Sequence, residues 1–421
     1  MFPHFEAGRI WLSGQANFIS QTNLPFYAQY SGTNSFRNRL AEATSRVLTL
    51  YTGFEFTKSI EGLVDVEEAG GSGLSQALGL AGFTNLDVVR NPSIGKAPYL
   101  ARLLYHQVIA LSHEKVVNAG NPLSTFSQLP ARRLEIRVGK FGLSDFFDVN
   151  SVGSDSHFQF MNWTIDQNGA FDYAADTRGY TWAAMVEYQS PKWGARFAEA
   201  LLPSVANGEH LVWALHRSNA SNAEFELHRG ILPKKDGTIR FLGFVNNANM
   251  GIYQVAIDQF LEGEVPAPNI IHHPPQVKKK YGLGINVEQA LTKSITAYGR
   301  FGWNNGKSES WCYTEDDDTF QIGTGFAGHL WRRRHDRAGV AFVSNGISSE
   351  HARYLADGGL GFLLGDGGLA YRRENILESY YTAHVWRGIF VGPDVQYIVD
   401  PGYNQVRGPI TVFSCRAHTE F

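Results

Sequence analysis

Hydrophobic and polar residues alternate along most of this chain, so that every second residue belongs to the same face. In residues 46–56, for example, Leu50 and Phe54 fall on one face and Thr49 on the other. A period of two is the signature of a β-strand whose two faces meet different surroundings. We therefore predict an all-β protein of about sixteen strands. The predicted strands cover residues 10–20, 46–56, 59–69, 99–112, 132–142, 179–189, 194–202, 223–230, 239–246, 281–289, 293–303, 319–331, 337–344, 375–386, 389–399 and 409–421.

The linkers between these strands are alternately short and long almost throughout. Short linkers include residues 57–58 and 387–388, and long ones include 143–178 and 247–280. Short turns at one rim, long loops at the other and an even number of strands are typical of an antiparallel up-and-down β-barrel in an outer membrane. A soluble sandwich also has two-faced strands, but it has no reason to sort its loops by length.

Two segments depart from this pattern. Residues 211–216 resemble a strand, but counting them would make the number of strands odd, so we place them in a long loop. The connection at 113–131 should be a short turn and is not.

The last residues keep the alternation to the end of the chain. Thr411, Phe413 and Phe421 share one face, and Arg416 and His418 share the other. Chain ends of soluble proteins are usually frayed and polar. We therefore expect this last strand to close the barrel against the strand predicted at 10–20, and the terminal Phe resembles the recognition signal of bacterial outer-membrane barrels.

Composition supports a membrane barrel once the alternation is known. Charged residues make up 18% of the 421 residues, against a usual value of about 25%. No stretch reaches the roughly 20 consecutive apolar residues that a membrane-spanning helix needs. A net charge of -3 argues against a nucleic-acid partner, which would need a basic face.

Nothing in the sequence points to an enzyme, a metal or a cofactor. Its two cysteines, Cys312 and Cys415, form neither a disulfide framework nor a zinc-binding spacing. Motifs for nucleophilic catalysis and for phosphate binding are not found. Residues 1–8 lack the pattern of a signal peptide, so for a secreted barrel we expect that the signal peptide has been removed.

A set of short motifs resembles the carbohydrate-selective porin family, often called OprB-like. Each motif alone is weak, but their order over most of the chain is specific. The motifs are Ala81-Gly82-Phe83, Pro98-Tyr99-Leu100-Ala101-Arg102, Val138-Gly139-Lys140-Phe141, Asp145-Phe146-Phe147-Asp148-Val149-Asn150, Phe160-Met161-Asn162-Trp163, Phe171-Asp172-Tyr173-Ala174-Ala175-Asp176, Arg178-Gly179-Tyr180-Thr181, Gly282-Leu283-Gly284-Ile285-Asn286-Val287-Glu288-Gln289, Ile376-Leu377-Glu378, Pro401-Gly402-Tyr403-Asn404 and Arg407-Gly408-Pro409.

This resemblance implies a single outer-membrane barrel over residues 1–421 that admits sugars by passive diffusion. Its partners would be sugars together with outer-membrane lipid and lipopolysaccharide, and a monomer and a homotrimer both stay open. Some related barrels handle polysaccharides, so polysaccharide export is the alternative function. Export of an anionic polymer would need a lumen of one charge sign.

A sugar-selective lumen needs charged groups of both signs, which exchange hydrogen bonds with hydroxyls without selecting ions strongly. Strand parity places two charged rows on inward faces, and Arg102 interrupts an otherwise apolar strand. The candidate lumen residues are Glu61, Asp65, Glu67, Arg102, Arg133, Glu135 and Arg137. A structural role, with these charges paired far from any constriction, is the competing interpretation.

The long segment 143–178 is rich in aromatic and acidic residues. Fully exposed, it would form a costly apolar patch, so we predict that it folds into or over the lumen and offers Trp163 as a stacking face. The alternative is a purely structural plug. The acidic run 315–318 is expected to be a solvated loop, and a divalent cation bound there at the lipopolysaccharide surface is the alternative. The aromatic residues expected at the membrane interfaces are Trp11, Tyr180, Trp182, Trp303, Trp331 and Trp386.

Overall fold

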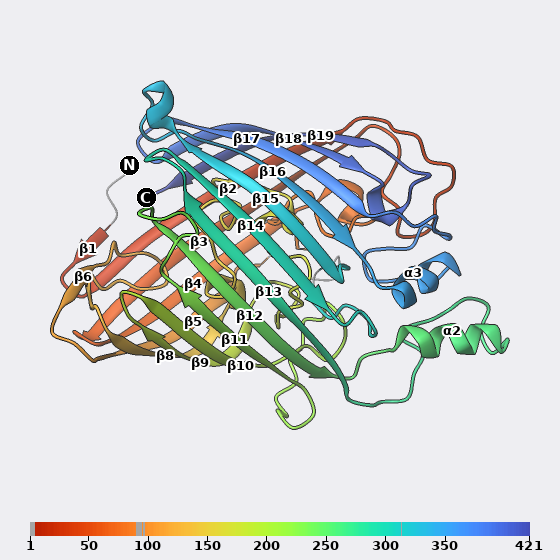
Figure 1. Ribbon diagram of the computed structural model, residues 1–421, viewed down its shortest axis with the longest axis horizontal. Helices are drawn as coiled ribbons and strands as arrows, with labels where there is room; N and C mark the ends of the chain where they lie inside the picture. The colour runs from red at the N-terminus through yellow and green to blue at the C-terminus, as the bar shows by residue number, and fades with distance from the viewer. Residues whose placement is uncertain (1–4, 90–94, 96, 313) are drawn as a thin grey trace.

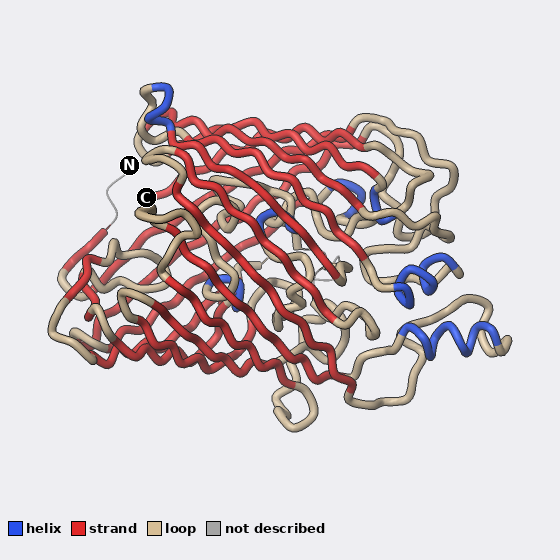
Figure 2. Tube along the Cα trace, in the orientation of Figure 1, coloured by secondary structure: helices blue, strands red, loops and turns tan. Residues whose placement is uncertain are grey.

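Sixteen antiparallel strands form a closed ring in the computed structural model of this protein, which describes residues 5–89, 95, 97–312 and 314–421 (Figures 1 and 2). Each strand pairs with its neighbours along the chain. The strands are β2 (Ile10–Asn23), β3 (Ala41–Thr57), β4 (Ile60–Gly71), β5 (Tyr99–Ala110), β8 (Arg133–Phe141), β9 (Thr181–Gln189), β10 (Trp193–Ala200), β11 (Asn219–Leu227), β12 (Gly237–Ala248), β13 (Lys278–Ala290), β14 (Ile295–Asn304), β15 (Asp318–Ala327), β16 (Arg337–Gly346), β17 (Glu374–Trp386), β18 (Ile389–Val399) and β19 (Ile410–Glu420).

The ring closes between its last and first strands, as the sequence predicts. β19 pairs with β2 from Val412 opposite Asn23 to Glu420 opposite Gln15. Two backbone hydrogen bonds of 3.0 and 3.2 Å then join Phe421 to Gly14. Beyond this point a short strand, β1 (Phe5–Ala7), pairs with the first residues of β2.

The strand faces are reversed relative to a soluble protein. On β4, Val64 and Val66 are about two-fifths exposed, whereas Glu61 and Asp65 are buried. On β9 the apolar Val186 is exposed and Glu187 is buried. An apolar exterior around a polar interior is the pattern of a barrel in lipid, where the outer side chains meet acyl chains and the inner ones meet water or each other.

Turns of two to nine residues connect the strands at one end of the ring, which we call the short-turn rim. It comprises residues 58–59, 190–192, 228–236, 291–294, 328–336 and 387–388. Its one longer connection within the described part of the chain, 111–132, carries a hairpin of β6 (Lys115–Val117) and β7 (Gln128–Pro130). The opposite end, the long-loop rim, comprises residues 24–40, 72–98, 142–180, 201–218, 249–277, 305–317, 347–373 and 400–409.

The helices all lie in connections. At the long-loop rim, α2 (Tyr253–Leu261) packs on α3 (Ser349–Ala356), with the rings of Tyr253 and His351 stacked at 4.3 Å (Figure 1). The shorter helices are α1 (Trp163–Asp166), η1 (Leu74–Gln76), η2 (Leu143–Asp145), η3 (Gly328–Trp331) and η4 (Pro401–Tyr403). Among the described residues, none of these helices is long and apolar enough to cross a membrane.

Three local predictions need correction. The strand predicted at 223–230 begins earlier and ends at Leu227, where the chain turns. The strand predicted at 319–331 ends at Ala327, where a tight turn begins. The turn requires glycine at position 328, because a Cβ there would lie only 1.8 Å from the Arg333 carbonyl oxygen. The acidic segment 315–317 is buried rather than solvated, since its carboxylates accept loop N–H groups, as Glu315 does from Leu364 at 2.6 Å.

Candidate functional site

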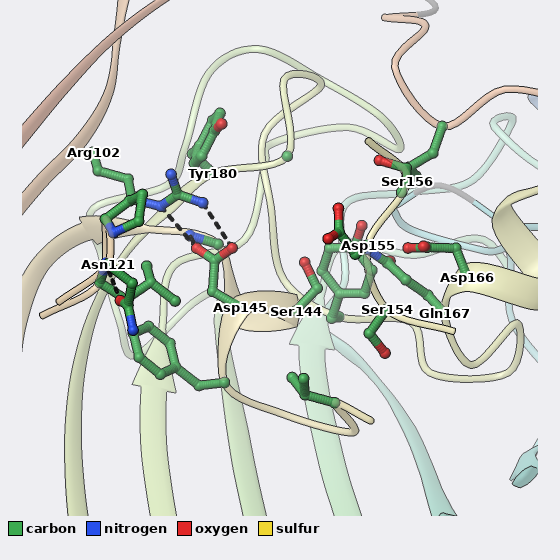
Figure 3. A pocket seen from close by; sticks show the side chains of 18 of the residues that line it. Arg102, Asn121, Ser144, Asp145, Ser154, Asp155, Ser156, Asp166, Gln167 and Tyr180 are labelled. Atoms are coloured by element: carbon green, nitrogen blue, oxygen red, sulfur yellow. Dashed lines mark hydrogen bonds and ion pairs between the residues drawn. The ribbon is translucent and has the colours of Figure 1, made fainter. Parts of the chain in front are cut away.

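A cavity of about 730 Å³ occupies one half of the ring. Strands β3–β5 and β8–β12 form its wall, and the connections 72–98, 111–132 and 142–180 supply the rest of its lining. Asn121 and Ser124 line it toward the short-turn rim, and Arg178 and Tyr180 line it toward the long-loop rim. Figure 3 shows Arg102, Asp145, Asn121 and Tyr180 among the side chains around this space. The cavity thus approaches both rims of the barrel.

The structure brings most of the predicted site residues together at this cavity. Six of the eight contribute to its lining, and the other two stand behind them. Asp65 accepts a hydrogen bond from Arg102, and Glu61 accepts hydrogen bonds from Thr125 of the hairpin connection. The six lining residues are Glu67, Arg102, Arg133, Glu135, Arg137 and Trp163.

Arg102 on β5 joins the barrel wall to the start of the long connection. Its guanidinium donates to Asp65 at 2.9 Å and to both carboxylate oxygens of Asp145 at 2.9 and 2.7 Å. Asp145 is held in place locally, because its carboxylate also accepts the backbone N–H of Gly142 at 3.2 Å at the start of η2. A two-pronged arginine–carboxylate pair fixes orientation as well as distance.

Three charged residues of β8, Arg133, Glu135 and Arg137, form a row that reaches the next strand. Arg133 donates to Glu135 at 2.6 Å, and Arg137 donates both to Glu135 and, at 2.8 Å, to Glu187 on β9. Their spacing of two residues places all three on the inner face.

Four further charged residues, which are not among the predicted lumen residues, continue this row around the wall. Arg196 on β10 pairs with Glu187 at 2.9 Å and with Glu226 on β11 at 3.1 Å. Glu226 in turn meets Arg240 on β12 at 3.4 Å. We call Arg102, Arg133, Glu135, Arg137, Glu187, Arg196, Glu226 and Arg240 the charged belt. Strand parity alone could have found the four on β9–β12, since each alternates with outward apolar residues.

Aromatic rings lie beside the charged belt. The ring of Tyr180 lies 5.5 Å from the Arg102 guanidinium, and that of Phe146 lies 4.9 Å from Arg137. Tyr180 therefore belongs to the lumen, which corrects its prediction as an interfacial residue. Burial raises the pKa of its hydroxyl, which donates to Glu67 at 3.1 Å. Trp163 offers the cavity little accessible surface, since it is 3% exposed and packs on Phe83.

The connection 142–180 crosses the inside of the ring and is held by inward side chains of strands far along the chain. Arg300 on β14 donates to the Ile165 carbonyl at 3.1 Å, and Arg416 on β19 donates to the Gln159 carbonyl at 2.7 Å. Gln321 on β15 donates to the Gln167 carbonyl at 2.8 Å. These side chains satisfy carbonyls that would otherwise be buried without partners.

An apolar cluster packs inside the half of the ring opposite the cavity and leaves there a smaller cavity of about 340 Å³, toward the short-turn rim. Phe160 and Ile165 from the long connection pack there with Tyr298, Val343 and Tyr380 of the wall, all of them buried. Such a packed layer leaves little room for a solute. The open space of the barrel is therefore shifted toward β3–β5 and β8–β12.

Comparison with known proteins agrees with this architecture. A family model described as carbohydrate-selective porin, OprB family, matches residues 43–421. The high-pH structure of Pseudomonas putida OprB is 15% identical, with 98% of this chain and 94% of that chain covered and a TM-score of 0.74. The low-pH structure of Pseudomonas putida OprB is 13% identical, with 98% of this chain and 93% of that chain covered and a TM-score of 0.51. A comparison with curated proteins found no match.

At these identities the solved structures establish a common fold, whereas the family model covers nearly the whole barrel and establishes the family of the chain. The reversed strand faces place that barrel in a lipid bilayer, in agreement with the family. The chain belongs to the carbohydrate-selective porins of the OprB family, which makes it a carbohydrate transport channel of the bacterial outer membrane.

Proposed function

We propose that neutral mono- and small oligosaccharides diffuse passively through the cavity, from the long-loop rim outside the cell to the short-turn rim in the periplasm. The observation that carries this proposal is the charged belt, in which both signs of charge alternate around one open space. Such a wall offers hydrogen-bond donors and acceptors to the hydroxyl groups of a sugar. Because the electrostatic fields of neighbouring opposite charges largely cancel, the wall selects between cations and anions only weakly.

Within this site we assign the constriction to the belt and the residues that hold it. Arg102, Arg133 and Arg137 would donate to sugar hydroxyls, and Glu67 and Glu135 would accept from them. Glu61 and Asp65 would act by holding their neighbours, because they bond to Thr125 and Arg102 rather than lining the cavity.

Stacking on the weakly apolar faces of a sugar ring requires partly accessible aromatic rings. Tyr99 and Phe146 are half-buried and line the cavity, so they fit this role better than Trp163 does. The connection 142–180, including the predicted segment 143–178, would narrow the passage from the side opposite the belt. Its firm attachment to β14–β19 suits a fixed constriction.

The exterior determines the remaining partners. The exposed apolar strand faces suit outer-membrane lipid, and at the long-loop rim the neighbours would be lipopolysaccharide molecules. Both a monomer and a homotrimer are compatible with these faces, because acyl chains and a second subunit would meet the same apolar side chains.

Liposome swelling tests the proposed function. Vesicles carrying the protein are diluted into isotonic glucose, a neutral disaccharide, or an amino acid of similar size to glucose. We expect the sugars to enter faster than the amino acid of equal size. Equal entry of glucose and the amino acid would contradict sugar selectivity, and faster entry of an anionic polymer would favour the export alternative. The variant Lys58→Ala, at an exposed short turn, serves as a control for charge removal away from the cavity.

A further inference from the structure

The hairpin connection 111–132 folds back into the barrel instead of simply joining β5 to β8. Asn118, Asn121 and Ser124 line the same cavity as the charged belt, although they belong to the short-turn rim. The buried hydroxyl oxygen of Ser124 has no hydrogen-bond partner among the described residues. The hairpin thus offers polar groups to the cavity at the end opposite the long loops.

Thr125 docks this hairpin on the barrel wall. Its backbone N–H and its hydroxyl both donate to one oxygen of Glu61 on β4, at 2.8 and 2.5 Å. The other oxygen of Glu61 lies 2.7 Å from His106 on β5, whose second ring nitrogen lies 2.8 Å from Glu135. Glu61, His106 and the Glu135 side chain are all buried, so the hairpin is connected to the belt through a chain of short polar contacts.

An apolar contact secures the hairpin next to these hydrogen bonds. Phe126 packs with Leu129 of β7 and Val108 of β5 in a small buried cluster. The ring of Phe126 lies 5.8 Å from that of His106. Thr125 and the residue that follows it are therefore both fixed against the inner wall.

The wall itself leaves space for the hairpin at Gly53 on β3. A Cβ at position 53 would lie 2.3 Å from the Thr125 methyl carbon, closer than such atoms approach in proteins, and 3.2 Å from Leu63. Glycine at this inward position therefore permits the close approach of Thr125 to β3.

We propose that the hairpin 111–132 is a second constriction at the periplasmic exit, docked by Glu61 and Gly53, and that it sets the largest sugar that passes. Glu61 is a positioning residue that acts through Thr125, and Asn118 and Asn121, which line the cavity and are not buried, are the groups that meet sugar hydroxyls. This inference rests on the proposed passage through the cavity, but it does not depend on which solute the passage prefers.

Cross-linking tests the docking directly. In the double variant Gly53→Cys and Thr125→Cys, the two Cβ atoms would lie 3.5 Å apart, within the range of about 3.5–4.5 Å that a disulfide requires. In a Cys415→Ser background, we expect this pair to oxidise in the outer membrane without added catalyst. The matched control Gly53→Cys, Thr125→Ala and Ser127→Cys removes the Thr125 methyl that a Cβ at position 53 would meet, places the second cysteine at an exposed neighbour on the hairpin, and should stay reduced. Failure of the first pair to cross-link would show that the hairpin does not occupy this position.

Conductance and solute size test the constriction. Thr125→Val, which removes the hydroxyl donor, and replacement of 113–130 by a short glycine-asparagine turn should both raise single-channel conductance, the replacement by about twofold or more. Both should also raise the entry rate of a trisaccharide relative to glucose, whereas Thr125→Ser should match the unchanged protein. Folding of each variant is checked by the shift of the heat-treated barrel on a gel.

The two proposals fail in different ways. An unchanged trisaccharide-to-glucose ratio in a folded replacement variant would overturn the second constriction. Equal entry rates of glucose and the amino acid through the protein without substitutions would instead overturn the proposed sugar selectivity. The conductance comparison would then still decide the role of the hairpin.

Discussion

Arg102 on β5 holds Asp145, the last residue of η2, through two parallel hydrogen bonds of 2.9 and 2.7 Å. The same guanidinium reaches back to Asp65 on β4, so one side chain links two wall strands to the first turn of the connection 142–180. Because Asp145 also accepts the Gly142 N–H, the connection leaves the wall in a fixed direction. This pair therefore connects the charge pattern of the wall to the course of the segment that crosses the lumen.

Replacing Arg102 by Lys should release the start of the connection while keeping the positive charge. A lysine ammonium cannot make the two parallel bonds of a guanidinium, and the loss of one charged hydrogen bond costs about 1.5–3 kcal/mol. We expect Arg102→Lys to increase current noise and conductance in planar bilayers. Lys58→Ala, which removes a charge at an exposed turn, should leave both unchanged. A quiet, unaltered channel in Arg102→Lys would mean that the bidentate pair does not position the connection.

Removing the side chains of both Arg133 and Arg137 should widen the passage at the charged belt and weaken its hydrogen bonding to sugars. The double change to Ala takes away two donors and leaves Glu135 with His106 as its remaining close partner. We expect higher conductance and a smaller difference between glucose and an amino acid of equal size in liposome swelling. Cation preference should rise as well, because the acidic side chains are then in excess. If conductance and selectivity both stayed the same, the constriction would lie elsewhere.

Arg300 should determine whether the connection 142–180 stays inside the ring. Its buried guanidinium donates to the carbonyls of Asp148 and Ile165 and pairs with the Asp148 carboxylate at 3.0 Å. Breaking a buried pair by removing one partner costs about 3–5 kcal/mol. We expect Arg300→Met to expose the connection to added protease in intact vesicles, whereas Lys192→Met at the short-turn rim should remain resistant. Protection of the connection in Arg300→Met would contradict this role.

Glu309 should make the long-loop rim sensitive to pH. Burial raises the pKa of this carboxyl, in the connection 305–317, from 4.5 to about 7, and it accepts the Gly251 N–H at 2.7 Å. Since the folded pKa lies above the unfolded one, the stabilisation is complete below pH 4.5 and is lost as pH rises through about 7, at about 1.4 kcal/mol per unit of pKa difference. Hydrogen exchange at Gly251, corrected for intrinsic rates, should therefore accelerate between pH 5 and pH 8. Glu309→Gln should abolish that dependence, and an equal acceleration in this variant would exclude Glu309 as its cause.

The strands of the barrel wall can be predicted from the sequence, because the alternation of side chains along each strand reflects the two environments that its faces meet. Every second residue on β4 and on β9 is apolar where it meets lipid, and the sixteen predicted strands correspond one to one with those of the ring. Turns such as 387–388 are short enough to fix which strands are neighbours. Local pattern is therefore sufficient for strand order and for the inward charges of β4 and β8.

The interior of the barrel depends on contacts between distant parts of the chain, which periodicity does not encode. Tyr180 directly precedes β9 and so resembles an interfacial aromatic residue, yet its hydroxyl turns inward to Glu67, more than a hundred positions away in sequence. Glu61 has the parity of a lumen residue, but the docked hairpin covers it. Both outcomes depend on where the connections fold, and the sequence gives no signal for that beyond their length.

The outward face of β9 allows a direct test of the lipid environment. Val186 lies near the middle of the strand, is 46% exposed and alternates with the inward Glu187. An arginine at the bilayer midplane of a barrel costs about 2–4 kcal/mol, so Val186→Arg should lower the free energy of unfolding by that amount in denaturant titrations of the protein in lipid vesicles. Val205 is exposed in the loop 201–218, outside the strands, and Val205→Arg should cost little. Equal destabilisation by the two changes would contradict a lipid-facing Val186, because only a position within the acyl region carries the cost of burying a guanidinium away from water.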